Sequence, residues 1–339
     1  MPPPKKLSVA VTGPTGEIGR AFIRALERSR EIGEIRGMAR SPFDPEAYGW
    51  RKTDYVRGDI LDPRAVQSFI AGADVAVHLA FIIFGDRSET RSINLEGSRN
   101  VFEATVASGC ERFVYTSSVS AYGFHADNPQ PLTEEVEPRG TEGFYYSAQK
   151  AELERTLDEV LEGSDTKAWV FRPSIVGGPD SPALVNNMPY LQAAEALPGP
   201  LRRALDALPT PTPVLPDFGT PLQLVHADDV ATALRSAVLG RGKPGVYNLA
   251  AKGEVQIADV ASALGWRSVK VPKAAIAATA QLLDRMPLAP ARAEWLHALR
   301  IPVIMDTAKA RRELRWRPKF DVAETLAETV AGAREETAG

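Results

Sequence analysis

Val9-Ala10-Val11-Thr12-Gly13-Pro14-Thr15-Gly16-Glu17-Ile18-Gly19 is the stretch of this sequence that decides the fold. A short apolar run, residues 7–11, predicts a buried strand that stops at Gly13. Apolar residues at helical spacing follow, at Ile18, Ala21, Phe22, Ala25 and Leu26. A strand that passes through glycines into a helix can hold a phosphate, because the first helical N–H groups are unpaired and glycine lets the backbone come close. We therefore expect a nucleotide site here; the alternative is a glycine turn that binds nothing.

Short apolar strands alternate with helical patterns along the first half of the chain. The predicted strands are residues 7–11, 35–39, 54–56, 75–80, 112–116 and 168–171, and amphipathic stretches between them include 94–107 and 146–161. This alternation predicts an α/β fold, a Rossmann-type doubly wound parallel sheet with helices on both faces. Ligands of such sheets bind beyond the carboxyl ends of the strands.

The regular alternation of strands and helical patterns ends after residue 172, and prolines become frequent. Residues 1–172 are the predicted dinucleotide-binding domain, and 222–250 are expected to return to it. Residues 173–221 and 251–339 are the predicted smaller, mixed substrate-binding lobe. Dense prolines over 173–221 predict an irregular, mobile cover. Later helices are predicted at 257–264, 274–283, 291–299 and 308–314, and a last one starts at Asp321 with Glu324 in a capping box.

Composition narrows the class of protein. The 339 residues are 44% hydrophobic and 24% charged with a net charge of −3, which gives no reason to expect nucleic acid or a membrane surface as a partner. The single cysteine, Cys110, excludes an internal disulfide and favours a cytoplasmic location. We expect no signal peptide, and the longest nearly apolar run, residues 75–84, is too short to span a bilayer. The histidines show no metal-ligand spacing, so no metal is expected.

A second informative stretch is Phe144-Tyr145-Tyr146-Ser147-Ala148-Gln149-Lys150. Tyr146 and Lys150 are four residues apart, so on a helix they project from one face. A nearby ammonium favours a phenolate, and Tyr146 is therefore expected to exchange protons near neutral pH. The alternative is that this stretch is an amphipathic helix with a surface lysine and has no catalytic role. The strand at 112–116 leads into Ser117-Ser118, which puts hydroxyl groups at the carboxyl end of a central strand.

With these motifs in order along nearly the whole chain, the sequence resembles an extended short-chain dehydrogenase/reductase of the NAD-dependent epimerase/dehydratase family. The matching parts are Thr12-Gly13-x-x-Gly16-x-x-Gly19, Gly58-Asp59-Ile60, His78-Leu79-Ala80, Asn94, Ser118 with Tyr122-Gly123, Tyr146-x-x-x-Lys150, Arg172-Pro173, Val225-His226-Ala227-Asp228-Asp229 and Trp316-Arg317-Pro318.

The resemblance implies a role for each matched residue. Tyr146 would be the general acid/base, Ser118 would bind the reacting oxygen, and Lys150 would lower the pKa of Tyr146 and hold the nicotinamide ribose. The residues implied to contact the cofactor are Gly13, Thr15, Gly16, Glu17, Ile18, Gly19, Arg40, Asp59, Ile60, Leu79, Ala80, Asn94, Tyr146, Lys150, Pro173 and Ile175. Family dimers would use the helices at 94–107 and 146–161, so a homodimer is a further expectation.

Three local features discriminate within the family. Arg40 stands at the end of the second strand, where an acidic residue suits NAD and an arginine suits the 2′-phosphate of NADP, so NADP is slightly favoured over NAD. Dehydratases of the family carry Asp-Glu after the catalytic hydroxyl residue, whereas this chain has Val119 and Ser120. Nucleotide-sugar epimerases usually carry an Arg-Asp-Tyr/Phe run where this chain has residues 222–224, Leu-Gln-Leu.

The sequence therefore predicts an NAD(P)-dependent oxidoreductase that interconverts a secondary alcohol and a ketone of a small-molecule substrate. A nucleotide-sugar 4-epimerase that retains NAD is one alternative. A dinucleotide-sensing protein without chemistry is another, although Ser118, Tyr146 and Lys150 are all present.

Overall fold

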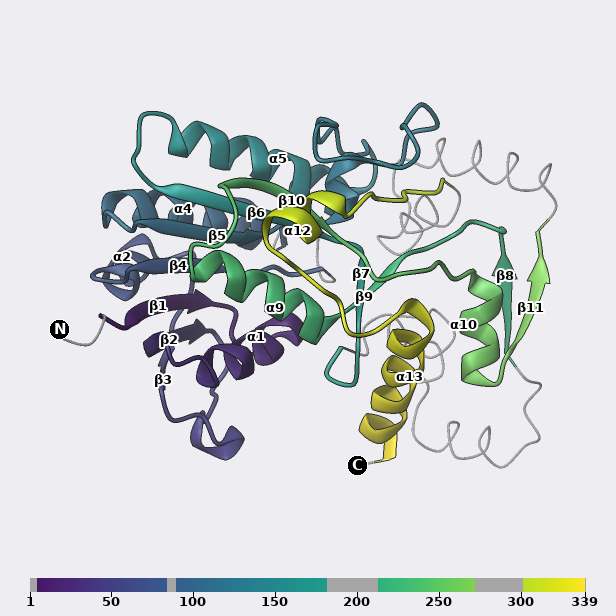
Figure 1. Cartoon of the computed structure of the whole chain (residues 1–339), viewed down its shortest axis with the longest axis horizontal. Coiled ribbons are helices and arrows are strands. Elements are labelled where there is room, and N and C mark those ends of the chain that lie inside the picture. The colour runs from purple at the N-terminus through teal and green to yellow at the C-terminus, as the bar shows by residue number, and fades with distance from the viewer. Residues whose placement is uncertain (1–4, 84–89, 182–212, 272–300, 339) are drawn as a thin grey trace.

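The central element of the structure is a parallel sheet of seven strands in the order β10-β6-β5-β4-β1-β2-β3 (Figure 1). The computed structural model describes residues 5–83, 90–181, 213–271 and 301–338. The strands are β1 (Leu7–Thr12), β2 (Ile32–Ala39), β3 (Thr53–Arg57), β4 (Val75–His78), β5 (Arg112–Thr116), β6 (Lys167–Pro173) and β10 (Gly245–Leu249). The order reverses at β1 and β4, which confirms the predicted doubly wound sheet.

Helices cover both faces of this sheet (Figure 1). One face packs on α1 (Glu17–Glu27) and α9 (Ala227–Val238), which share a core with β1, β6 and β10. The other face packs on α2 (Pro63–Ile70), α4 (Ser98–Ala107) and α5 (Tyr145–Leu161). The strands are apolar on both sides because each side is covered. Single turns lie at η1 (Glu46–Tyr48) and η3 (Val119–Tyr122), and a π-helical segment, η2 (Ser92–Gly97), precedes α4 where one continuous helix was predicted.

A smaller lobe lies beside the carboxyl ends of the sheet (Figure 1). It contains two parallel pairs, β7 (Ile175–Gly177) with β9 (Leu224–His226) and β8 (Val214–Asp217) with β11 (Arg267–Lys270). Helices α10 (Ile257–Leu264) and α13 (Val322–Ala338) share an apolar core with β7, β8 and β9. The prediction of an irregular 173–221 cover was wrong at β7 and β8, because each finds a parallel partner from a distant part of the chain.

Two groups of sequence-based expectations fall outside the described residues: the helices at 274–283 and 291–299, and the centre of the 173–221 cover. The boundary between the two predicted lobes stays a prediction. Among the described residues, no helix is both long and apolar enough to cross a membrane.

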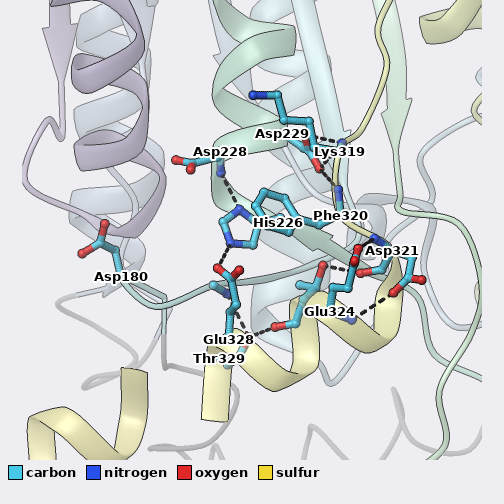
Figure 2. Close-up of polar contacts among 12 residues, drawn as sticks. Asp180, His226, Asp228, Asp229, Lys319, Phe320, Asp321, Glu324, Glu328 and Thr329 are labelled. Atoms are coloured by element: carbon cyan, nitrogen blue, oxygen red, sulfur yellow. Dashed lines mark hydrogen bonds and ion pairs between the residues drawn. The ribbon is translucent and has the colours of Figure 1, made fainter. Parts of the chain in front are cut away.

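Asp229, near the start of α9, fastens the segment that leads into the last helix (Figure 2). Its carboxylate accepts the backbone N–H groups of Lys319 (2.9 Å) and Phe320 (3.1 Å), and its carbonyl accepts the indole N–H of Trp316 at 2.8 Å. The chain therefore returns from α12 (Ala308–Glu313) across α9 before α13 begins. The motif at residues 225–229 and the motif at residues 316–318 therefore contact each other, through Asp229 and Trp316.

His226 makes the second fastening (Figure 2). Its Nδ1 accepts the backbone N–H of Asp228 at 3.1 Å, so its Nε2 carries the hydrogen and donates to Glu328 of α13, also at 3.1 Å. The Phe320 ring stacks on the imidazole with centroids 3.9 Å apart. At the start of α13, Asp321 and Glu324 exchange side-chain-to-backbone hydrogen bonds of 2.9 Å, which confirms the predicted capping box.

Replacing Asp229 with alanine is expected to destabilise the protein by about 2 kcal/mol, because two backbone N–H groups lose their charged acceptor in a buried place. Urea unfolding measures this change. Asp228→Ala is the matched control: its carboxylate is 48% exposed and pairs with Arg24, so its loss should cost less than about 1 kcal/mol. Equal losses in the two variants would contradict the role of Asp229.

Candidate active site

The glycine turn after β1 is shaped by two close backbone approaches. Gly13 has a φ of +77° and donates its N–H to the Met38 carbonyl at 2.9 Å. A Cβ on Gly13 would lie 2.6 Å from the Ala80 nitrogen, and a Cβ on Gly19 would lie 2.2 Å from the Gly13 oxygen. Both positions therefore require glycine for packing alone.

Gly16 differs, because no protein contact requires a glycine there. A Cβ at this exposed position would meet only the Gly13 oxygen, at an ordinary 3.6 Å. Gly16 is the N-cap of α1, and no side chain caps that helix. An uncapped helix start beside an open glycine fits a dinucleotide pyrophosphate, since the helix N–H groups and dipole attract an anion.

The other predicted cofactor residues follow neighbouring strands at the same edge of the sheet. Thr15, Glu17 and Ile18 are half-buried around the glycine turn, Arg40 is exposed after β2, and Asp59 and Ile60 follow β3. Leu79 and Ala80 follow β4, Pro173 ends β6 and Ile175 starts β7. The parallel sheet brings all of these strand ends to one side, where a dinucleotide would lie. Their contacts with a cofactor stay predictions.

Asn94 supports a loop in this structure. Its side-chain amide donates to the Ile82 carbonyl (2.9 Å) and to Gln149 of α5 (2.9 Å), and its oxygen accepts the Ile82 N–H at 2.8 Å. It lies in the π-helical segment η2 and is fully buried. Asn94 therefore positions the segment that follows β4 against α5, and its predicted contact with the cofactor stays a prediction.

Tyr146 and Lys150 lie on the buried face of α5, beside Ser118. Tyr146 is 8% exposed, hydrogen-bonds to Ser118, and meets the Phe81 ring edge-on at 5.5 Å. Lys150 is 3% exposed; its Nζ donates to the Thr116 carbonyl at 3.0 Å and lies 3.8 Å from the centroid of the same Phe81 ring. The structure thus brings the three predicted catalytic residues together around the end of β5.

The electrostatics of this pair differ from the sequence-based expectation. Burial raises the pKa of Tyr146 to about 12, although the hydrogen bond with Ser118 opposes the rise. Burial lowers the pKa of Lys150 to about 7, and the charge of Glu154 opposes that fall. The pKa of Tyr146 thus lies above its usual value and not near neutrality, because desolvation disfavours the charged form of both groups. The role of Lys150 in lowering that pKa stays a prediction.

Glu154, one turn beyond Lys150 on α5, links this helix to β6 and to the end of β5. The Arg172 Nε–H is shared between the two carboxylate oxygens of Glu154, at 3.0 and 3.2 Å, and the Arg172 Nη2 donates to one of them at 2.5 Å. The Ser117 hydroxyl donates to the other oxygen at 2.5 Å. The Arg172 guanidinium stacks over the Tyr122 ring at 4.3 Å, and the pair with Glu154 is buried. Because of this network, α5, β6 and the end of β5 hold one arrangement around Lys150.

Sequence reasoning did not single out Phe81, Gln149 or Glu154. Glu154 had a detectable signal, because it follows Lys150 by four residues and so lies on the same helical face. Phe81 and Gln149 had none, since their roles depend on which loop the sheet brings beside α5.

Several other residues considered in the sequence lie away from this centre or outside the described part. His125 bonds to the Gly140 carbonyl at 2.6 Å, and His78 bonds to Thr12 and Ser98. Burial lowers the pKa of His78 to about 3, so it is a neutral core residue. Among the described residues, no cluster of three or more His, Cys, Asp or Glu could hold a metal ion.

A family model described as "NAD dependent epimerase/dehydratase family" matches residues 9–250. Over 327 residues the chain is 28% identical to the uncharacterized protein y4nG of Sinorhizobium fredii, covering 94% of this chain and 76% of that protein. It is 28% identical over 241 residues to a protein named ceramide reductase of Caulobacter vibrioides, covering 68% of this chain and 62% of the relative.

Two solved structures are similar over 98% of both chains. One is a short-chain dehydrogenase/reductase superfamily protein from Agrobacterium tumefaciens with bound NAD, at a TM-score of 0.71 and 19% identity. The other is the dTDP-glucose 4,6-dehydratase of Streptomyces venezuelae with NAD bound, at a TM-score of 0.72 and 21% identity. At these identities the likeness shows the fold alone.

The buried Lys150 gives stability a specific pH dependence. Its pKa of about 7 lies below the ordinary lysine value of 10.5, so between these values the unfolded chain binds a proton that the folded protein does not. Stability therefore rises with pH across this window and falls as the pH drops toward 7. Lys150→Met should remove a slope that approaches about 1.4 kcal/mol per pH unit.

Urea unfolding of the wild type and of Lys150→Met from about pH 7.5 to 9.5 tests this slope. Lys167→Met removes an exposed lysine at the start of β6 and should leave the pH dependence unchanged. Parallel curves for the wild type and Lys150→Met would mean that Lys150 keeps an ordinary pKa.

Proposed function

The chain belongs to the NAD-dependent epimerase/dehydratase family, as its motifs predicted, and from this premise we propose that it is an NAD(P)-dependent reductase of a ketone with an apolar body. In this proposal Tyr146 is the proton donor, Ser118 binds the reacting oxygen, and Lys150 is the neighbouring amine, whose pKa of about 7 lets it take up or release a proton near neutral pH. Reduction is reversible, so the same residues would also serve oxidation of the secondary alcohol.

The observation that carries the proposal is the geometry around the end of β5: the Tyr146 phenol bonds to Ser118, and Lys150, one helical turn on, bonds to the Thr116 carbonyl. Reduction of a ketone needs a proton donor at this place, and the buried Tyr146 phenol, whose pKa burial raises, is protonated at neutral pH. A bound nicotinamide would supply the hydride. Tyr146 would give its proton to the same carbonyl oxygen that Ser118 holds, and a fixed position for that oxygen lowers the entropic part of the barrier.

The side chains around Tyr146 support an apolar substrate. Phe124 and Phe144 pack with Tyr146 in one buried cluster, and Ile83, Ile301 and Val303 lie partly exposed against it. An aliphatic or ring body of the substrate would gain from contact with such side chains. The relative named ceramide reductase has a lipid in its name, which supports a lipid-like substrate.

The segment before β9 supports a substrate without a diphosphate. Leu222 and Leu224 are buried in the core of the small lobe. Gln223 exchanges hydrogen bonds with the Met305 backbone, at 2.9 and 3.3 Å, so its amide is engaged. No cationic side chain stands at these three positions to meet a nucleotide sugar. Arg202, Arg203 and Arg292, which could hold a diphosphate elsewhere, lie outside the described residues.

The end of β2 supports NADP. Arg40 is exposed there, and its carbonyl accepts a hydrogen bond from the Arg57 Nε at 2.9 Å, so two arginines meet where an NAD enzyme usually has an acidic residue. Two guanidinium groups suit a 2′-phosphate, which they can bind through bidentate hydrogen bonds.

The function test is NADPH consumption with a panel of apolar ketones, including long-chain and cyclic ones. Tyr146→Phe should lower kcat by about 10²–10⁴-fold, because the proton donor is lost. Tyr48→Phe, which changes an exposed phenol in η1, should leave kcat unchanged. Full activity in Tyr146→Phe would contradict the proposed role. If the purified protein instead holds NAD tightly and interconverts nucleotide sugars, the epimerase alternative replaces the reductase.

The preference for NADP over NAD is tested with a variant of Arg40. Arg40→Asp should weaken NADP binding at least about tenfold while leaving NAD binding equal or stronger, since a carboxylate repels the 2′-phosphate and accepts a hydrogen bond from the ribose hydroxyl. Fluorescence titration with both cofactors measures this change. Arg51→Asp alters an exposed arginine before β3 and should change neither affinity. If Arg40→Asp does not alter the ratio of the two affinities, the assignment of NADP is wrong.

A further inference from the structure

A basic cavity of about 680 Å³ lies at the amino edge of the sheet, the edge opposite the glycine turn. It is bounded by the last turn of α9, the turn that leads into β10, and the segment after α12. The side chains that matter are those of Arg235, Arg241, Arg315 and Arg317, together with Glu313 and Trp316. None of these residues takes part in the proposed reaction, so the inference below does not rest on it.

The cavity carries more positive charge than its own carboxylates neutralise. Glu313 is the one acidic residue in its lining, and its two oxygens bond to Tyr247 (2.9 Å) and Arg312 (3.1 Å), both outside the lining. Glu31 lies outside the lining. Its hydrogen bond with the Ser29 hydroxyl is the main cause that lowers its pKa, and the charges of Arg241 and Arg235 lower that pKa further. Four lining arginines thus face two carboxylates that already have other partners.

Three of the four guanidinium groups have no protein acceptor among the described residues. Arg317 donates to the carbonyls of Arg311 and Trp316, both at 3.0 Å. No hydrogen bond or ion pair within the described part of the chain engages the side chains of Arg235, Arg241 or Arg315, and the Nε of Arg235 is buried without a partner. A buried donor without an acceptor is unfavourable, and a bound anion would satisfy it.

Arg315 is held in a conformation that favours glycine. Its φ is +55°, and it is the one non-glycine residue with a positive φ in the described ranges. The N–H of Trp316 bonds back to the Ala310 carbonyl at 3.3 Å, so Arg315 occupies the left-handed position that ends α12, where glycine is usual. An arginine side chain is thus kept at a place where it costs backbone strain, and such strain concentrates at functional positions.

The amino-edge cavity at Lys5, Gly33 and Asp74 provides a contrast. Its two acidic lining residues, Asp74 and Glu34, pair with its own Lys5 (2.7 Å) and Arg36 (3.5 Å). That lining has one more cation than carboxylates, because Lys6 is left over, whereas the lining at Arg315 has four arginines for one glutamate.

We propose that the Arg235–Arg241–Arg315–Arg317 cavity binds a phosphate-bearing small molecule. Arginine suits this ligand because its planar donors match phosphate oxygens in pairs. The volume is in the range of small-molecule sites, large enough for a phosphate ester as well as for a free phosphate or pyrophosphate. The site lies across the sheet from the glycine turn, so its ligand is separate from the dinucleotide.

Isothermal titration of the full chain with inorganic pyrophosphate, at constant ionic strength, tests the proposal. Arg315→Gly is the central variant: it removes the guanidinium and relieves the backbone strain, so the ligand-free melting temperature should stay equal or rise. Pyrophosphate affinity should nevertheless fall at least about tenfold. Arg241→Gln, at an exposed turn, should weaken binding similarly without unfolding the protein.

Arg311→Gln is the matched control, because Arg311 is an exposed arginine of α12 outside the cavity lining. It removes the same charge and should leave pyrophosphate affinity unchanged. Citrate as the titrant separates phosphate recognition from general anion binding, and orthophosphate and a sugar phosphate as titrants separate a free phosphate from a phosphate ester. No binding to the wild type, or equal affinity in Arg315→Gly and the wild type, would overturn the proposal; the second result would place the anion elsewhere, for instance at the glycine turn.

Discussion

The rest of the structure depends on one close approach of backbone, at the turn after β1. Gly13 lies against Ala80 and donates to Met38, while Gly19 lies against Gly13 itself. These contacts bring α1 down onto the sheet between β2 and β4, with its uncapped start at the carboxyl edge. Side chains at Gly13 or Gly19 would push the strand ends apart. This packing positions the predicted cofactor residues that follow β1, β2, β3 and β4, whereas Asn94 lies in η2, and Tyr146 and Lys150 lie on α5.

The chemistry of the site arises from burial more than from charge pairing. Tyr146 and Lys150 both contact the Phe81 ring and are both buried. Desolvation therefore favours the neutral form of each group. Burying Lys150 lowers stability at neutral pH, and the neighbouring Glu154 reduces that loss while it is itself held by Arg172 and Ser117. In the proposed reductase, the place of the Tyr146 phenol beside Ser118 would let it exchange a proton with the same substrate oxygen that Ser118 binds.

The small lobe is attached by polar contacts as well as by its apolar core. Asp229 and His226 begin α9, a helix of the large sheet, yet their side chains hold Lys319, Phe320 and Glu328 of the last segment (Figure 2). The movement of α13 relative to the sheet is limited by these bonds. The same return of the chain carries Arg315 and Arg317 to the far edge of α9, where they form the basic cavity with Arg235 and Arg241.

The sequence by itself determined the fold class, the order of most strands and helices, the capping box at Asp321 and the family. These depend on local periodicity, glycine placement and motif spacing, which are readable along one segment at a time. Only the tertiary structure decided the parallel pairing of β7 with β9 and of β8 with β11, the contacts of Asn94 with Ile82 and Gln149, and the convergence of four arginines on one cavity. Each of these features joins segments that are separated in the sequence. The tertiary structure also decided the pKa values of Tyr146 and Lys150: spacing shows that the two groups share a helical face, but the degree of desolvation depends on Phe81 and the strands packed around them.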